Sequence, residues 1–427
     1  MVDVLTLDNG LRLVFTPMPN ARSISISIYM TAGSRYEAPE DAGLSHFVEH
    51  LCFKGTERRP RPHDVAVEID SIGGSINAVT DRELTVYYAK VTPEYAERAM
   101  DVLADIVRHS LFREEEIERE RGVILEELAS IEDSPMDQVG VLLDGLLWPG
   151  QPHGRDIAGT PETVSAISSE RLVGYYRRQY VANACVVAIA GAIDEQRVEH
   201  MVRETLGDWE PGEPHDWLRT TEEPRGQRVG LIAKETEQAH LSFGVRALSF
   251  RDDDRHALDV LSVVLGEGMS SRLFTRLREE LGLCYDIHTF VAHLRDTGMF
   301  GLYAGVDPKQ AQDAIHEIVN ELRRAVLQPI TPDELERAQV LLRARVQLHM
   351  EDTRAIASWY GSHVVLDLPR TTPEEAIART DAVTREDVQR VAARLISDEQ
   401  LHLAVVGPLV GEDLLTGLNV NGPATDG

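Results

Sequence analysis

The chain is poor in cysteine and has no long apolar run. Its 427 residues include only three cysteines, Cys52, Cys185 and Cys284, at widely separated positions. An odd and sparse set of this kind offers no disulfide framework and indicates a reducing compartment. No segment approaches the roughly 18 apolar residues that cross a membrane, and residues 1–15 contain no basic leader. We therefore expect a cytoplasmic protein that does not span a membrane.

Basic residues are also scarce. The chain has 43 Lys and Arg against 71 Asp and Glu, a formal net charge of −28 at pH 7. Proteins that bind nucleic acid or an anionic membrane surface present clustered Lys and Arg, so neither is an expected partner. A hydrophobic content of 43% and a charged content of 27% are typical of a globular protein. The length is sufficient for more than one domain with its own core.

The most informative segment is His46-Phe47-Val48-Glu49-His50, which has the pattern H-x-x-E-H. On a helix, His46 and His50 lie about 40° apart, and Glu49 lies about 60° to the other side of His46. Two neutral imidazoles on one helix face can bind zinc, and a neighbouring carboxylate can accept a proton from water. The pattern is the inverse of the H-E-x-x-H motif of zinc proteases. The alternative is a helix whose histidines are only hydrogen-bonded or at the surface.

Two parts of the chain follow the same plan. Val86–Glu94 and Leu302–Pro308 each read as a strand that leads to a proline at the start of an amphipathic helix. Phe112–Arg119 resembles Ile330–Arg337, and a long helix is expected after each. Residues 211–227, between the copies, are rich in Pro, Gly and charge, which is typical of a linker.

The repeat predicts an α+β fold with two homologous domains of about 200 residues, each a mainly antiparallel sheet packed with helices. Residues 1–210 would form the N-terminal zinc-binding catalytic domain. Residues 228–427 would form a C-terminal domain without metal ligands. Ser23–Met30 alternates with period two, as expected of a strand with one face in a core.

The second copy provides an internal control for the motif. The segment that corresponds to the histidine helix is Arg255–Gly266, and it contains mainly Val and Leu where the first copy has His, Glu and His. If the fold required the three polar residues, both copies would have them. We infer that the trio has a chemical role in the first copy.

A catalytic zinc usually has three protein ligands and one water, so a third ligand is expected. The helix after Phe112 has an apolar stripe around Ile124. Glu120 lies about 40° and Glu127 about 60° from Ile124, whereas Glu126 lies about 160° away. A buried carboxylate costs several kcal/mol unless it is paired with a metal or a base. Glu127 or Glu120 is therefore the candidate ligand, and Glu126 is expected to be solvated.

The second copy has Ala338 and Arg345 where the first has Glu120 and Glu127. The two carboxylates are absent from the same copy that lacks the histidine pair. This joint absence links the long helix to the H-x-x-E-H helix. The alternative is a pair of surface glutamates in a charge-rich helix.

Four segments of the chain resemble the pitrilysin/insulinase family of zinc metallopeptidases. They are residues 43–56 (GLSHFVEHLCFKGT), 73–80 (GGSINAVT), 118–128 (ERERGVILEEL) and 270–285 (SSRLFTRLREELGLCY). The chain is most similar to the short-chain branch, which includes the mitochondrial processing peptidase β-subunit and bacterial homologues. With the two-copy plan, the resemblance covers essentially the whole chain.

The resemblance implies a role for each residue of the site. His46, His50 and Glu127 would bind one zinc ion per chain, Glu49 would be the catalytic base, and Glu120 would orient a ligand.

The resemblance also implies residues that contact the substrate. The family pairs an Asn-Ala edge strand with the substrate backbone, which here corresponds to Asn77 and Ala78 after Gly74. Arg278 and Tyr285 match an Arg and a Tyr that the family places near the bound peptide and the oxyanion. In two-chain members these residues face the zinc site across a clamshell. We expect them to act from a partner subunit, and the sequence leaves action within one chain open.

The function expected from these inferences is a zinc-dependent endopeptidase. Its substrates would be short or unfolded peptides enclosed in a chamber that two chains form, as a homodimer or as a heterodimer with a paralogous subunit. Two alternatives remain open. One is a non-catalytic structural subunit like the core proteins of respiratory complexes, and the other is a peptide-binding module that holds zinc without turnover.

Overall fold

The computed structural model describes residues 2–222, 228–409, 414 and 420 of the chain. The chain forms two compact units. Unit 1 comprises Met1–Leu128, Arg155–Arg219 and Gln347–Thr372, and unit 2 comprises Ala129–Gly154, Thr220–Val346 and Pro373–Gly427. Each unit contains one sheet packed with helices, so the predicted α+β class is confirmed.

Unit 1 contains a six-stranded, mainly antiparallel sheet. Its spatial order is β1 (Val4–Thr6), β2 (Arg12–Pro17), β6 (Cys185–Gly191), β3 (Ile24–Met30), β5 (Thr85–Val91) and β4 (Ser75–Thr80). Only β2 and β6 run parallel. Because β4 is the last strand in this order, its outer side is a sheet edge.

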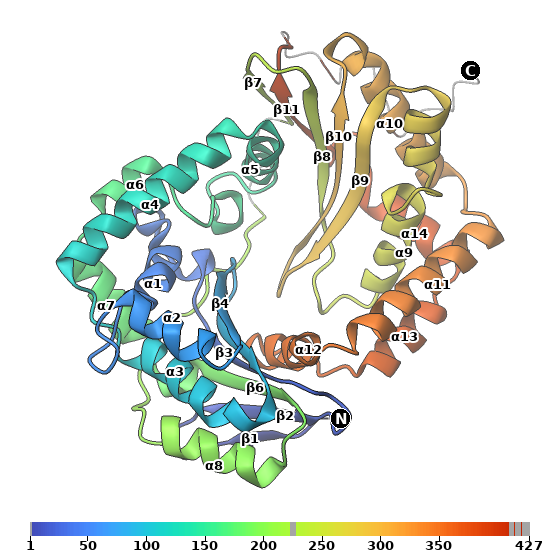
Figure 1. The fold of residues 1–427 in the computed structure, drawn as a ribbon. Coiled ribbons are helices and arrows are strands. Elements are labelled where there is room, and N and C mark those ends of the chain that lie inside the picture. Colours follow the sequence, from blue (N-terminus) through green and yellow to red (C-terminus); the bar gives the residue numbers. More distant parts are fainter. Residues whose placement is uncertain (1, 223–227, 410–413, 415–419, 421–427) are drawn as a thin grey trace. The chain divides into compact units, whose positions relative to one another are not determined.

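The helices of unit 1 cover both faces of this sheet (Figure 1). Helices α3 and α8 pack on one face and α12 packs against β3 and β6 on the other. The α-helices of unit 1 are α1 (Leu44–Cys52), α2 (Pro62–Asp70), α3 (Ala96–Arg108), most of α4 (Glu114–Asp133), α6 (Pro161–Ala166), α7 (Ser169–Gln179), α8 (Glu195–Leu206) and α12 (Thr353–Val365).

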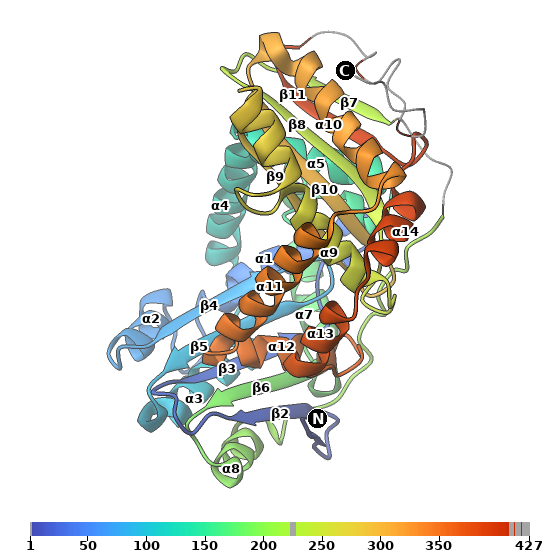
Figure 2. The same ribbon diagram turned by 90° about the vertical axis from the view of Figure 1, so that its right-hand side faces the viewer.

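Unit 2 contains a five-stranded sheet in the order β7 (Val229–Ala233), β11 (His402–Gly407), β8 (Ala239–Ala247), β10 (Gly298–Val306) and β9 (Cys284–His293). Its helices are α5 (Pro135–Leu147), α9 (Arg255–Gly266), α10 (Ala311–Leu327), most of α11 (Pro332–His349), α13 (Pro373–Asp381), α14 (Arg385–Leu395) and a π-helical segment, η6 (Phe274–Glu280). Helices α9, α10 and α14 belong to one apolar core, and α5 packs on the opposite side of β8 and β11 (Figure 2).

Apart from β1, which has no counterpart among the described strands of unit 2, the two sheets share one topology. In unit 1, β2 and β6 are parallel, and β6–β3, β3–β5 and β5–β4 are antiparallel. In unit 2, β7 and β11 are parallel, and β11–β8, β8–β10 and β10–β9 are antiparallel. The internal repeat seen in the sequence therefore corresponds to a repeated strand arrangement.

The compact units differ from the contiguous domains 1–210 and 228–427 that the repeat suggests. Helix α5 belongs to the first half of the sequence but packs in unit 2, and α12 belongs to the second half but packs in unit 1. The two halves thus each contribute one helix to the sheet of the other. Contiguous ranges cannot describe this exchange.

The expected linker, 211–227, is partly anchored. The Arg35 guanidinium is fully buried, donates to the carbonyl of Leu218 at 2.8 Å and lies 4.5 Å from the ring centroid of Trp217. The first part of this segment therefore packs in unit 1. Residues 223–227 lie outside the described residues.

Strand β3 differs from its expected pattern, because every residue of Ile24–Met30 is buried. Its isoleucines face the main core of unit 1, and Ser25 and Ser27 face α12. The Ser25 hydroxyl lies 2.8 Å from the hydroxyl of Thr353 at the start of α12. The periodicity indicated one face in a core; the second face is buried as well, because a helix from the distant second half of the chain covers it.

Within the described residues, no helix combines the length and the apolar character that a membrane crossing needs.

Candidate metal centre

Helix α1 starts at Leu44 and is held at its N-terminus by a buried carboxylate. Gly43 has φ of 94°, and a Cβ there would lie 2.5 Å from the carbonyl oxygen of Ala158. The Glu37 carboxylate accepts hydrogen bonds from the backbone N–H groups of Gly43 (3.1 Å) and Ser45 (2.6 Å). Burial raises the pKa of Glu37 to about 7. A glycine and a carboxylate thus fix the first turn of the helix that bears the motif.

The apolar residues of α1 direct the motif to one side. Leu44, Phe47, Val48 and Leu51 are buried in the core of unit 1. His46 and His50, on the remaining side, are both half-buried, and their ring centroids lie 4.6 Å apart in an edge-to-face arrangement. This is the helical geometry that the spacing predicts.

Helix α4 brings Glu127 to the two histidines. Its Oε2 lies 3.8 Å from Nε2 of His46 and 3.8 Å from Nε2 of His50. One ligand atom from each residue lies within 4.8 Å of the others, and the described residues contain no second group of this kind. Glu126, the neighbour, is exposed and lies outside the cluster.

The chemistry and spacing of the cluster fit a zinc ion. Donor atoms about 2.1 Å from a tetrahedral zinc lie about 3.4 Å apart, close to the observed N–O separations. Burial, and the neighbouring His50, lower the pKa of His46 to about 4, so its imidazole is neutral at pH 7, as a metal ligand must be. His46 Nδ1 is buried and has no hydrogen-bond partner among the described residues. Nε2, on the other side of the ring, points at the cluster.

Glu120 contacts His50 from the side opposite the cluster. Its Oε2 lies 3.1 Å from Nδ1 of His50, and its Oε1 lies 2.8 Å from Nζ of Lys54. Because a carboxylate only accepts, the proton of a neutral His50 belongs on Nδ1, which leaves the Nε2 lone pair free for a metal. Burial alone would raise the pKa of Glu120, but the contacts with His50 and Lys54 outweigh it and lower this pKa.

Glu49 lies beside the cluster and has an elevated pKa. Burial raises the pKa of Glu49, and a hydrogen bond from Thr80 partly opposes this effect. The Thr80 hydroxyl, at the end of β4, donates to Oε2 of Glu49 at 2.7 Å. A raised pKa makes a carboxylate a stronger base than an ordinary glutamate, which suits a group that accepts a proton.

The predicted substrate-binding residues lie on and before the edge strand β4. The side chain of Asn77 is exposed, whereas that of Ala78 points into the core. Gly74 precedes the strand, and a Cβ there would lie 2.7 Å from Cγ1 of Val91. Val91 belongs to β5, so the close packing of β4 on β5 at this end requires a glycine.

Arg278 and Tyr285 lie together in unit 2. The Arg278 guanidinium stacks 5.0 Å from the ring centroid of Tyr285 and 4.9 Å from that of Phe274. Tyr285 is 74% exposed. These two residues belong to unit 2 and the His46–His50–Glu127 cluster belongs to unit 1.

Three contacts of the site were not found from the sequence: those of Lys54, Thr80 and Glu37. Lys54 follows His50 by four residues, but it lies beyond the last residue of α1, where helical periodicity gives no direction. Thr80 and Glu37 reach α1 from separate segments. No local pattern in the sequence signals such contacts.

Two histidines and a glutamate from a second helix, with a glutamate beside the second histidine, define the class of inverted-motif zinc sites. A family model described as Insulinase (Peptidase family M16) matches residues 12–161. A second, described as Peptidase M16 inactive domain, matches residues 166–342. The chain belongs to this family, the M16 or pitrilysin/insulinase peptidases, as the sequence motifs predict.

Curated relatives match nearly the whole chain. An uncharacterized zinc protease of Streptomyces coelicolor is 38% identical over 95% of this chain and 89% of its own length. The uncharacterized zinc protease YmxG of Bacillus subtilis is 35% identical, with coverage of 96% and 98%. A probable mitochondrial-processing peptidase subunit beta of Arabidopsis thaliana is 32% identical, with coverage of 95% and 78%. Both of these bacterial relatives are named zinc proteases.

Solved structures have the same fold. A protease from Helicobacter pylori has a TM-score of 0.88 and 21% identity, and the match covers 96% of this chain and 99% of that chain. A chain of complex III2 from Candida albicans has a TM-score of 0.81 and 19% identity, with coverage of 98% and 97%. At these identities the likeness shows the fold alone.

Proposed function

We propose that this protein is a zinc-dependent endopeptidase. The observation that supports the proposal most directly is the convergence of one ligand atom each from His46, His50 and Glu127 within 4.8 Å. Glu49 lies on the same helix as the two histidines. The names of the two bacterial relatives, which call them zinc proteases, agree with this proposal.

Each residue of the cluster has a chemical task in this reaction. His46, His50 and Glu127 would hold one zinc ion per chain. Bound there, the ion would supply a Lewis acid that polarises a carbonyl and activates water. Glu49 accepts a proton from the attacking water and passes it to the leaving amine. Its raised pKa favours the first of these transfers, because a raised pKa makes the carboxylate a stronger base. Glu120 keeps the His50 ring in the orientation that the metal requires.

We further propose that the substrate is a short or unfolded peptide in extended form. The edge strand β4 offers backbone N–H and C=O groups, and pairing with such an edge recognises main chain rather than side chains. Asn77 and Ala78 belong to this edge, and Gly74 keeps its start close to β5. In a folded protein most strands already have paired neighbours, whereas a short or unfolded peptide has a free backbone.

The working form in this proposal contains two chains that enclose the substrate. Arg278 and Tyr285 of one chain would stabilise the oxyanion at the zinc site of the other. The second chain is either another copy or a paralogue. The exposed phenol of Tyr285, stacked on Arg278, is consistent with a residue that meets substrate.

The first experiment separates zinc binding from catalysis. The zinc-loaded parent and a Glu49→Gln variant are compared on a quenched peptide library, with bound zinc measured by elemental analysis. We expect the variant to keep one zinc per chain and to lose about 10²- to 10⁴-fold in kcat/KM. If the variant cleaves as fast as the parent, Glu49 is not the base. If the zinc-loaded parent cleaves nothing, alone or with a paralogue, a structural or peptide-binding subunit is the better assignment.

Neighbouring glutamates of α4 provide a matched test of the third ligand. Glu127→Gln removes the anionic donor that faces both histidines, and Glu126→Gln changes an exposed carboxylate outside the cluster. We expect zinc affinity to fall at least about ten-fold for Glu127→Gln and to stay at the parent value for Glu126→Gln. Equal affinities for the two variants would contradict the ligand assignment.

A mixing experiment tests whether the oxyanion residues act between chains. Glu49→Gln and Tyr285→Phe chains are assayed separately and together, after their mass in solution has been measured. If Tyr285 acts on the partner's site, a mixed dimer pairs an intact Glu49 with an intact Tyr285, and part of the activity returns. No recovery in a proven mixed dimer would assign Tyr285 to its own chain or to no role.

A further inference from the structure

The loop after α1 carries a lysine that contacts Glu120, the carboxylate beside His50 of the proposed metal centre. Lys54 lies two residues after the end of α1, and its Nζ is 2.8 Å from Oε1 of Glu120. The other carboxylate oxygen lies 3.1 Å from Nδ1 of His50. Only 4% of the Glu120 side chain and 25% of the Lys54 side chain are exposed. The three residues form a chain of contacts that ends at a proposed metal ligand.

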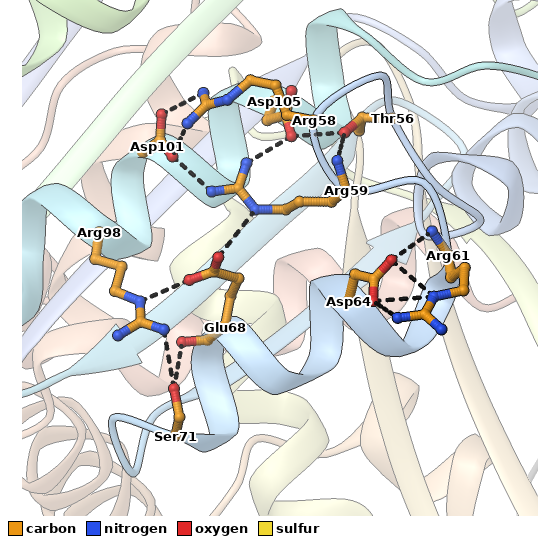
Figure 3. A network of polar contacts seen from close by, with 10 residues as sticks. All are labelled: Thr56, Arg58, Arg59, Arg61, Asp64, Glu68, Ser71, Arg98, Asp101 and Asp105. Carbon is orange, nitrogen blue, oxygen red and sulfur yellow. Dashed lines mark hydrogen bonds and ion pairs between the residues drawn. The ribbon is translucent and has the colours of Figure 1, made fainter.

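The path of this loop is fixed by a separate network on α3 (Figure 3). The Arg59 guanidinium donates to Asp105 at 2.6 Å and to Asp101 at 2.6 Å. Thr56 donates to the same oxygen of Asp105 at 2.7 Å, and its Oγ1 accepts from the backbone N–H of Arg59 at 2.9 Å. Both Thr56 and Arg59 are buried.

The backbone on the N-terminal side of this network is equally constrained. Gly55 has φ of 119°, and a Cβ there would lie 2.6 Å from the carbonyl oxygen of Pro60. Its own carbonyl accepts from the backbone N–H of Leu111 at 3.1 Å. Lys54 is therefore attached to a loop with little freedom, and its ammonium reaches Glu120 from a defined position.

We propose that Lys54 is a positioning residue for the metal centre. Its ammonium holds the Glu120 carboxylate against Nδ1 of His50, and this contact keeps Nε2 of His50 directed at the zinc. The inference rests on the proposed zinc site and adds a residue to it. Lys54 touches neither the cluster nor the proposed base among the contacts of the described residues.

The physical argument concerns a buried carboxylate with two oxygens. Glu120 can satisfy His50 with one oxygen, but the other would then be a buried acceptor without a charged partner. Without Lys54, rotation of the carboxylate toward solvent becomes favourable, and the His50 contact weakens with it. A carboxylate held at both oxygens has one orientation, which is the requirement for orienting an imidazole.

The second copy of the repeat agrees with this coupling. Ala338 occupies the place of Glu120 there, and residues 267–271, which follow α9, contain no lysine or arginine. The lysine, its carboxylate partner and the histidines are absent together.

The test measures zinc affinity by competition with a chromogenic chelator, which needs no peptidase activity. The variants are Lys54→Met, Lys54→Arg and, as a matched control, Arg58→Gln. Arg58 lies on the same loop and pairs with Asp101, 2.6 Å away, which keeps Arg59 as a second partner. We expect the zinc dissociation constant of Lys54→Met to be at least about ten-fold larger than that of the parent. The constant of Lys54→Arg should lie between those two values, and that of Arg58→Gln should equal the parent value.

A double-mutant cycle tests whether Lys54 acts through Glu120. In a Glu120→Gln background, Lys54→Met should cause little further loss of zinc affinity, because the carboxylate it positions is gone. The inference is overturned if Lys54→Met binds zinc like the parent, if Arg58→Gln loses as much affinity, or if the losses from Lys54 and Glu120 multiply. A parent that binds zinc but cleaves no peptide would refute the proposed function and leave this inference standing.

Discussion

Four carboxylates lie around α1, and their surroundings give them different properties. Glu37 is buried at the start of the helix with a pKa of about 7, and Glu120 is buried with a lowered pKa because His50 and Lys54 contact it. Glu49 has a raised pKa beside the cluster, and Glu127 is 45% exposed and faces both histidines. At the scale of single residues, burial and the nearest charge give each carboxylate a different proton affinity, and the proposed roles in the fold, in metal binding and in proton transfer rest on these differences.

Glu37 makes the stability of the metal-free protein depend on pH. Burial raises its pKa from 4.5 to about 7, so between these values the folded protein keeps a proton that the unfolded chain releases. The contribution of Glu37 to the free energy of unfolding is therefore largest below pH 4.5 and decreases as the pH rises to about 7. The loss approaches about 3 kcal/mol, since one pKa unit corresponds to about 1.4 kcal/mol.

Denaturant unfolding of the metal-free protein between pH 4.5 and 8 checks this prediction. A Glu37→Gln variant cannot titrate at this position, so its stability relative to the parent should increase across the window. Glu40→Gln, at an exposed position of the same segment, is the control and should follow the parent. A constant difference between parent and Glu37→Gln over the whole range would contradict the assignment.

At the scale of secondary-structure elements, the proposed metal centre depends on how α1 and α4 are placed. The position of α1 is determined at both ends by glycines with positive φ, Gly43 and Gly55, where backbone atoms approach too closely for a side chain. Helix α4 instead depends on apolar packing through Ile117, Ile124 and Leu128. The backbone conformation of the two glycines therefore determines the position of α1, and the burial of apolar side chains determines the position of α4.

Two glycine substitutions distinguish a helix positioned by backbone conformation, α1, from a helix positioned by apolar packing, α4. Gly43→Ala places a Cβ 2.5 Å from the carbonyl oxygen of Ala158 at φ of 94°. We expect it to lower the free energy of unfolding by about 1–3 kcal/mol and to weaken zinc binding, because α1 must shift. Gly122→Ala, in the exposed middle of α4 with open space around it, should instead raise stability by about 0.5–1 kcal/mol and leave zinc binding unchanged.

Thermal or denaturant unfolding of both variants, with zinc affinity measured beside it, provides the check. A Gly43→Ala protein as stable as the parent and with parental zinc affinity would show that α1 tolerates a side chain there. Destabilisation by Gly122→Ala would show that α4 is constrained by more than its apolar stripe.

At the scale of the whole molecule, the main feature is the exchange of α5 and α12 between the halves of the sequence. Helix α12 covers Ser25 and Ser27 of β3, and Gly361 of α12 leaves so little room that a Cβ would lie 2.4 Å from the ring of Tyr29. In unit 2, Leu143 of α5 packs against the sheet close to Gly244 of β8. Each sheet needs a helix from the other half to bury its second face.

The exchange predicts that the halves do not fold alone. Residues 1–210, expressed without the rest, lack α12 and expose one face of β3 and β6 to water. We expect this fragment to unfold without cooperativity and to bind zinc weakly or not at all. Co-expression with residues 211–427, which contain α12 and the Leu218 carbonyl that Arg35 contacts, should restore both properties. Near-UV circular dichroism and zinc titration of the fragment and of the co-expressed pair test this prediction. A cooperative, zinc-binding fragment 1–210 would contradict it.

Much of the site was predictable because helical periodicity is a local property. The spacing of His46 and His50 placed their side chains on one face, and the phase of α4 relative to Ile124 selected Glu127 over Glu126. The repeat predicted two similar sheets because each copy carries its own strands. The contacts of Lys54, Thr80 and Glu37 were not predictable in this way, since each depends on the path of a loop or strand.

The sequence by itself determined the family, the α+β class, the repeat and the residues able to bind a metal, because these follow from residue identity and short-range spacing. Only the tertiary structure decided that Ser25 and Ser27 are buried, that Lys54 reaches Glu120, and that α5 and α12 change places. The physical reason is that burial depends on what covers a surface. Here the covering helix lies in the other half of the chain, beyond the range of any local pattern.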